Sequence, residues 1–323
     1  MKRLSLLFLA VFCLLAISYT IEAQPATKTP ANEQPAVAPA KNAAADSKAA
    51  RDAEAARILA ERRAQARSLL ISLAADARNF NDRTLRARTQ ARIADALWDA
   101  DPERARTMFR NAWEAAEVAD AEGQRRLREE VQQQSAKTGG AAVMMPPDVR
   151  GEVLRRAARR DRALGEEFLA KLKVEKQQEA TEASDGSRRA MDTPAAISQR
   201  LTLARQLLDT DVERALQFAD PVLATVTTDG LDFLSSLRDK DAAAADQRYA
   251  AMLGNASANI QSDANTVAAL SAYLFTPHMY VTFSGGGASS QSRVAGSPPP
   301  NVAPELRTLF FRAAADILLR PLA

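Results

Sequence analysis

Few residues in this chain have side chains that could carry out chemistry or bind a metal. The chain contains one histidine, His278, and one cysteine, Cys13. His278 lies in the stretch FTPHMYVTF, which has no second histidine, no cysteine and no carboxylate. A metal site or a catalytic triad needs such partners, so we interpret His278 as an ordinary histidine after a proline. Cys13 lies within an apolar N-terminal run, so the rest of the chain can have neither thiol chemistry nor a disulfide.

Neither the glycines nor the carboxylates form a recognisable site motif. Gly285-Gly286-Gly287 has no lysine after it and no strand-to-helix frame around it, as a phosphate-binding loop requires. The chain has 40 acidic residues, but none of them belongs to a catalytic motif. We therefore predict no catalytic, cofactor-binding or metal-binding residues, and no cofactor. A glycan-cleaving hydrolase that uses a pair of carboxylates stays open as an alternative function.

Arginine dominates the charge of the N-terminal half. Ten arginines and no lysine lie between Arg51 and Arg92, against five acidic residues. A second cluster runs from Arg155 to Arg162. Acidic residues at helical reach of this cluster are Glu152, Asp161, Glu166 and Glu167. A nucleic-acid or anionic-membrane face would use such clusters, but no aromatic residues are interleaved with the first and the net charge is only +3. We interpret the arginines as a solvated helix surface with exposed ion pairs along each helix, and we expect no nucleic-acid partner.

The elements that must position any site are helices, and the stretch from Ala91 to Ala116 shows their pattern. Asp101 is well placed as the N-cap of a second helix in this stretch, because its carboxylate can accept hydrogen bonds from free backbone N–H groups. Pro102 follows at the first helical position, where no hydrogen bond is lost. The short connection at residues 99–101 predicts an antiparallel helical hairpin. The apolar positions that recur at helical spacing are Ile93, Ala96, Leu97 and Trp98, then Ala105, Met108, Phe109, Ala112, Trp113 and Ala116.

The same corner recurs at three later aspartates, Asp161, Asp211 and Asp241, which together with Asp101 we assign as structural helix corners. A small residue in the first turn after each corner allows two helix axes to approach closely. The corners are 60, 50 and 30 residues apart, which predicts a unit of about thirty residues with insertions. The residues four places before the corners are Leu97, Ala157, Leu207 and Leu237, and those four places after are Ala105, Gly165, Ala215 and Ala245.

On these corners the chain resembles the tetratricopeptide-like α-solenoids, which are stacks of helical hairpins. The most similar segment is LLDTDVERA, residues 207–215, and the resemblance covers about residues 85–255. The family's W-x-x-L-G-x-x-Y signature is absent, and the spacing departs from a steady repeat of about 34 residues. The resemblance implies an all-α fold of stacked antiparallel helical hairpins. It implies no specific ligand.

The sequence predicts three segments of different character. Residues 1–23 combine a cationic start, an apolar run and a permissible cleavage edge at Ala23, which is typical of a secretory signal peptide. An uncleaved N-terminal membrane anchor is the alternative. Residues 24–46 are rich in Pro and Ala and are predicted to be a disordered tether. Residues 47–323 are predicted to form the helical repeat-like domain, with flexible insertions near 174–192 and 284–303.

The C-terminal part does not follow the repeat of about thirty residues. Residues 275–283 are the only β-like run, and the loop expected after them is rich in Gly, Ser and Pro. Residues 305–319 are predicted to form an amphipathic helix that closes the end of the stack.

These features favour an exported, non-catalytic helical scaffold in the periplasm or the extracellular space. A stack of helical hairpins presents a concave binding surface and needs no special residues in its sequence. The expected partner is a protein or another cell-envelope component, with no membrane span after signal cleavage. The hydrolase alternative would require two carboxylates that face each other across one deep apolar cleft. The sequence indicates no oligomeric state.

Overall fold

The computed structural model describes residues 40–138, 145–182, 193–284, 286–292 and 298–320. By its contacts the chain divides into two units, residues 1–60 and residues 61–323. The first unit is described from Ala40 onward, where helix α1 (Ala40–Arg78) begins, and residues 48–60 are exposed. The predicted signal peptide, and the tether up to residue 39, lie outside the described residues.

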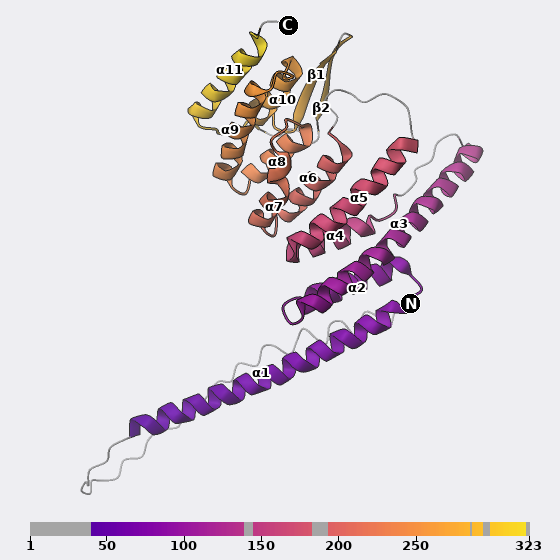
Figure 1. Ribbon diagram of the computed structural model, residues 1–323, viewed down its shortest axis with the longest axis vertical. Coiled ribbons are helices and arrows are strands. Elements are labelled where there is room, and N and C mark those ends of the chain that lie inside the picture. Colours follow the sequence, from indigo (N-terminus) through magenta and orange to yellow (C-terminus); the bar gives the residue numbers. More distant parts are fainter. Residues whose placement is uncertain (1–39, 139–144, 183–192, 285, 293–297, 321–323) are drawn as a thin grey trace. The chain divides into compact units, whose positions relative to one another are not determined.

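The described part of the second unit is predominantly helical, which confirms the all-α prediction (Figure 1). Its exception is a short antiparallel hairpin of strands β1 (Met279–Ser284) and β2 (Gly287–Ser292). No helix among the described residues combines the length and the apolarity that crossing a membrane requires. The helices after α1 are α2 (Arg83–Leu97), α3 (Pro102–Thr138), α4 (Val149–Arg160), α5 (Arg162–Glu182), α6 (Ala195–Leu207), α7 (Val212–Ala219), the short 3-10 helix η1 (Asp220–Val222), α8 (Thr228–Arg238), α9 (Ala242–Ala258), α10 (Ala264–Phe275) and α11 (Pro304–Leu318).

The helices of the second unit pack in pairs, and the pairs pack on each other. Helix α2 packs against α3, α4 against α5, α6 against α7, and α8 against α9. The first helices of these pairs also contact each other in chain order, α2 with α4, α4 with α6, and α6 with α8. We call α2, α4, α6 and α8 the first-helix row. At the C-terminal end, α11 packs against α9 and α10 (Figure 1).

The four aspartates assigned as helix corners stand directly before the second helix of each pair. Asp101, Asp161, Asp211 and Asp241 precede α3, α5, α7 and α9. One side-chain oxygen of each accepts a hydrogen bond from a backbone N–H in the following turn, over 3.2, 2.9, 2.8 and 2.9 Å respectively. The backbone N–H of each donates to the carbonyl oxygen four residues earlier, and its own carbonyl accepts from the N–H four residues later. The four corners therefore share one hydrogen-bond pattern.

The positions four residues before and after each corner are buried in all four pairs. Gly165, which follows Asp161, shows why the later position is small. A Cβ atom added there would lie 2.7 Å from Cζ of Phe218 and 2.9 Å from Cβ of Ala158. Both distances are shorter than a van der Waals contact, so the crossing of these helices leaves no space for a side chain.

Two helices extend into stretches for which the sequence predicted irregular structure. Helix α1 begins at Ala40, within the predicted tether, and α5 continues to Glu182, within the insertion predicted near 174–192. Residues 40–46 are rich in Ala, and residues 174–182 are rich in Glu and Gln; these residue types have high helix propensity and continue a helix without a buried face. Residues 183–192 lie outside the described residues.

Strand β2 lies within the loop predicted near 284–303. Its residues pair with β1 from Met279↔Ser292 to Ser284↔Gly287, and Gly287 adopts a φ of 132° at the turn, which favours glycine. Every residue of β2 is exposed, so its sequence carries no alternation of apolar and polar residues. Such a strand has no hydrophobic pattern by which it could be predicted.

Candidate functional site

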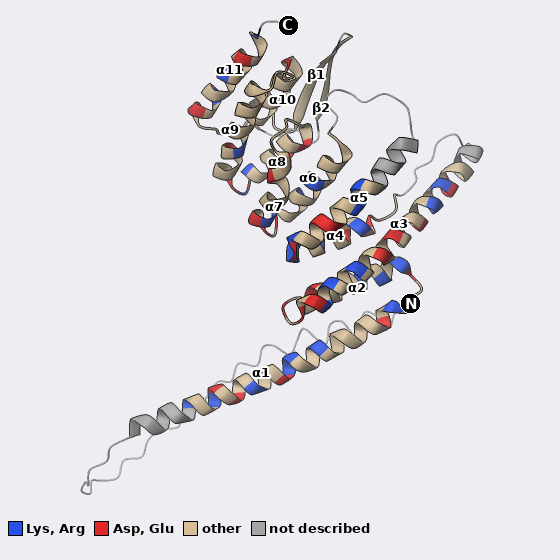
Figure 2. Cartoon of the chain, viewed as in Figure 1, with Lys and Arg blue, Asp and Glu red and all other residues tan. Residues whose placement is uncertain are grey.

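The first-helix row carries a seam of arginines and carboxylates between α2 and α4. Arg88, Arg92 and Asp95 recur at helical spacing along α2 and face α4, and Asp99 just after α2 continues this spacing. Arg88 Nε donates to Glu152 Oε2 at 2.9 Å. Asp95 accepts from Arg159 Nη2 and from Arg160 Nε, each at 2.6 Å. Figure 2 shows such mixed charges along α2 to α5, whereas β1 and β2 carry none.

These ion pairs differ from the pairs along single helices that the sequence predicted. Glu152 and Asp161 accept from Arg88 of α2 and Arg106 of α3. The acidic residues and their partners in other helices are Glu152 with Arg88, Asp161 with Arg106, Glu166 with Arg200, and Glu167 with Arg110. Much of the arginine excess therefore links one helix to another.

The carboxylates of the seam are poor candidates for the general acid of a hydrolase. The hydrogen bond from Arg88 lowers the pKa of Glu152. Burial raises the pKa of Asp95, but hydrogen bonds from Arg160 and Arg159 outweigh burial and lower it. Among the described residues, every carboxyl group whose pKa shifts is shifted downward. A general acid needs a raised pKa, so these groups cannot hold the required proton near neutral pH.

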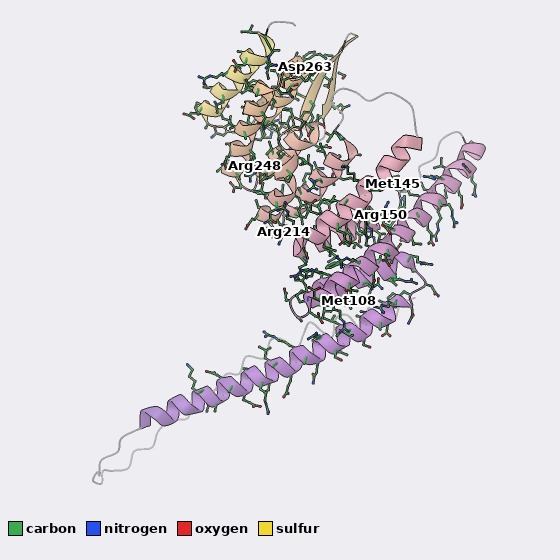
Figure 3. The ribbon with its side chains drawn as sticks, in the orientation of Figure 1. Met108, Met145, Arg150, Arg214, Arg248 and Asp263 are labelled. Carbon is green, nitrogen blue, oxygen red and sulfur yellow. The ribbon has the colours of Figure 1, made fainter. Side chains whose placement is uncertain are left out.

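A groove lies between α4 and α6, next to the seam along α4. It has a volume of about 370 Å³. Arg150, labelled in Figure 3 at the start of α4, lines it and already donates to Asp120 Oδ2 at 3.0 Å. The buried side-chain oxygen of Gln199 has no hydrogen-bond partner among the described residues. The charged residues that line the groove are Asp148 and Arg150, its uncharged polar residues are Ser198, Gln199, Thr202 and Gln206, and Leu154 and Leu203 lie among them.

His278 has a carboxylate partner that the sequence did not reveal. Its Nδ1 lies 2.9 Å from Oδ1 of Asp232 in α8, and the Tyr280 hydroxyl donates to the same oxygen at 2.6 Å. The Asp232 side chain is 0% exposed. His278 adopts a φ of 65°, a left-handed conformation that costs free energy in a residue with a side chain. The buried carboxylate therefore holds the start of β1 against α8 through two side chains.

This His278–Asp232–Tyr280 cluster lacks the nucleophile of a catalytic triad. No hydroxyl or thiol among the described residues donates to Nε2 of His278. The described residues also contain no group of three or more His, Cys, Asp or Glu side chains that could hold a metal ion. The arrangement serves to anchor the β-hairpin.

A further cavity lies between the start of α2 and the middle of α3. Its volume is about 600 Å³, and Pro146 and Pro147 form part of its wall. Asp82, Glu122 and Glu130 line it together with Arg83 and Arg126. A wall of mixed charges is not the apolar cleft with two facing carboxylates that a glycan-cleaving site would require.

The four corner aspartates belong to the frame of the pairs, not to a ligand site. The residues that sequence reasoning missed are Asp232, Tyr280 and Gln199. The signal for Asp232 was a carboxylate among the apolar residues of a helix, and nothing in the sequence distinguished Gln199. Comparison of the chain with protein-family models, with curated proteins and with solved structures finds no match.

Proposed function

We propose that the protein is an exported, non-catalytic helical scaffold that binds a protein or another cell-envelope component along its first-helix row. In this proposal the helix pairs form a tetratricopeptide-like α-solenoid. The shared hydrogen-bond pattern at Asp101, Asp161, Asp211 and Asp241 carries the proposal, because equivalent corners are what repeated hairpins require. The contacts of α2 with α4, α4 with α6, and α6 with α8 support it.

The first-helix row is the binding surface in this proposal for two reasons. Its seam between α2 and α4 is charged, and its groove between α4 and α6 contains Gln199, whose side-chain oxygen has no hydrogen-bond partner among the described residues. Polar groups that a protein leaves without a partner are candidates for contact with a ligand. The downward pKa shifts of Asp95, Glu152 and Asp161 favour the scaffold over the hydrolase, since none of these groups can act as the acid.

Site-specific photo-crosslinking in the native host tests the binding function. Thr202 lines the groove and is exposed, and Glu213 is an exposed position of α7, in a second helix. A photoreactive amino acid at Thr202 is expected to form one discrete adduct, and the same amino acid at Glu213 is expected to form none. Equal labelling at both positions, or no adduct at either, would contradict binding along the first-helix row.

Export is tested by the mass of the protein isolated from its native host. The cationic start, the apolar run and the edge at Ala23 predict a mature chain that begins at or near Gln24. Intact-mass spectrometry of the periplasmic and secreted fractions is expected to find this species. A full-length chain retained in the membrane fraction would establish the anchored alternative instead.

A further inference from the structure

The seam between α2 and α4 contains more arginines than its carboxylates can neutralise. Among the described residues, Asp95, Asp99 and Glu152 of the seam, together with Asp82 near Arg88, face six arginines, a net excess of two positive charges (6 − 4). Arg92 and Arg155 are exposed and make no ion pair or hydrogen bond with any described residue. The six arginines are Arg88, Arg92, Arg155, Arg156, Arg159 and Arg160.

Arg156 lies where these positive charges converge. Burial lowers the pKa of its guanidinium, Asp95 opposes that effect, and Arg92, Arg159 and Arg155 lower the pKa further. Asp95 cannot compensate fully, because it also accepts from Arg159 and Arg160. We call Arg92, Arg155, Arg156 and Arg159 the arginine cluster. An additional anion placed beside the cluster would relieve its repulsion, and a guanidinium can bind a carboxylate or a phosphate through two parallel hydrogen bonds.

The groove next to the cluster distinguishes between these two kinds of anion. Gln199 lines the groove, and its buried side-chain oxygen needs a hydrogen-bond donor that the described residues do not supply. A backbone N–H group of a peptide can donate to this oxygen once the Gln199 side chain turns toward the groove. A polyphosphate has only acceptors near neutral pH, so it would leave Gln199 unsatisfied.

We infer that the arginine cluster and the adjoining groove bind an extended, acidic peptide segment of a partner protein. The carboxylates of the segment pair with Arg92, Arg155 and their neighbours, and one of its backbone N–H groups donates to Gln199. The inference rests on the proposed binding function of the first-helix row and specifies the class of partner. It does not depend on export.

Fluorescence anisotropy with the purified protein tests the inference. The probe is a fluorescent synthetic peptide of alternating Glu and Gly, compared with the same peptide in which Gln replaces Glu, and with tripolyphosphate as a competitor. The double variant Arg92→Gln/Arg155→Gln is expected to weaken binding of the acidic peptide about tenfold or more, because it removes charge-assisted hydrogen bonds. Gln199→Leu is expected to weaken it about threefold to tenfold, through loss of one neutral hydrogen bond.

The matched control is Arg104→Gln/Arg128→Gln, which makes the same change of charge at two exposed arginines of α3. It is expected to leave the affinity within about twofold of the parent, since screening weakens the effect of distant charges. Thermal melts of all variants verify that they fold.

Absence of binding to the acidic peptide would overturn the inference, as would an equal loss in both double variants. Tripolyphosphate that competes strongly while Gln199→Leu has no effect would overturn it in favour of a phosphate-bearing partner. If the Thr202 crosslink forms in cells but the acidic peptide does not bind, the scaffold function stands and the partner class is wrong. If neither is observed, both proposals fail.

Discussion

Replacement of Asp232 by alanine is expected to lower the free energy of unfolding by about 3 kcal/mol. The variant leaves His278 Nδ1 and the Tyr280 hydroxyl without their shared acceptor, and both side chains are largely enclosed between β1 and α8. An unsatisfied buried polar group costs about 1 to 3 kcal/mol, and the variant removes an acceptor from two largely enclosed groups at once. Urea denaturation at neutral pH, followed by circular dichroism, measures the change.

Two milder variants distinguish the loss of hydrogen bonds to the carboxylate from the loss of side-chain volume. Asp232→Asn keeps an acceptor oxygen and is expected to cost less than Asp232→Ala. Tyr280→Phe removes the hydroxyl donor to Asp232 and is expected to lower the free energy of unfolding by about 1 kcal/mol. Substitutions at exposed positions usually change the free energy of unfolding by less than about 0.5 kcal/mol. If Asp232→Ala changes it by no more than that, the carboxylate does not anchor the β-hairpin.

Gly165→Ala is expected to destabilise the protein by about 1 to 3 kcal/mol, although alanine is the better helix former. The added methyl group would lie within 3 Å of Phe218 Cζ and of Ala158 Cβ. Ala158 Cα is also only 3.1 Å away, and a backbone atom cannot move aside as a flexible side chain can. The helices that cross at this corner must therefore separate. Thermal and urea unfolding measure the loss.

Gly254→Ala is the matched control for this prediction. Gly254 lies inside α9, and a Cβ atom added there meets no other atom within 4 Å. The same substitution is expected to stabilise the protein by about 0.5 to 1 kcal/mol, because alanine restricts the unfolded chain more than glycine does. If the substitution lowers the free energy of unfolding at Gly165 and raises it at Gly254, the difference is due to the close crossing of helices at Gly165. If both substitutions stabilise the chain, the crossing after Asp161 is not tight.

The helix corners could be recognised in the sequence because their interactions are local. Asp211 accepts from the N–H of Arg214, three residues later, and Ala215 donates to the carbonyl oxygen of Asp211. An N-cap and the small residue after it are separated by a fixed number of residues, so spacing alone reveals them. The lengths of α1 and α5 could not be obtained in this way, because neither helix is interrupted by a strong breaker at the predicted boundary.

The partner of His278 could not be recognised in the sequence. Asp232 is 46 residues away along the chain. The two residues meet because α10 packs against α8 and the chain then turns into β1. Residues next to Asp232 in α8, such as Leu231 and Phe233, are apolar and buried. Their pattern indicates that this part of α8 is buried, but it does not indicate where the Asp232 carboxylate points.

The sequence by itself determined that the chain is predominantly helical and where Asp101, Asp161, Asp211 and Asp241 start new helices, since these features depend on hydrogen bonds and apolar spacing within a few residues. It also determined the excess of arginine. Only the tertiary structure decided which arginines are neutralised. Asp95 of α2 binds Arg159 and Arg160 of α4, whereas Arg92, which lies on α2 like Asp95, has no partner among the described residues. The strength of an ion pair depends on distance in space, and packing of α2 on α4 sets that distance independently of separation along the chain.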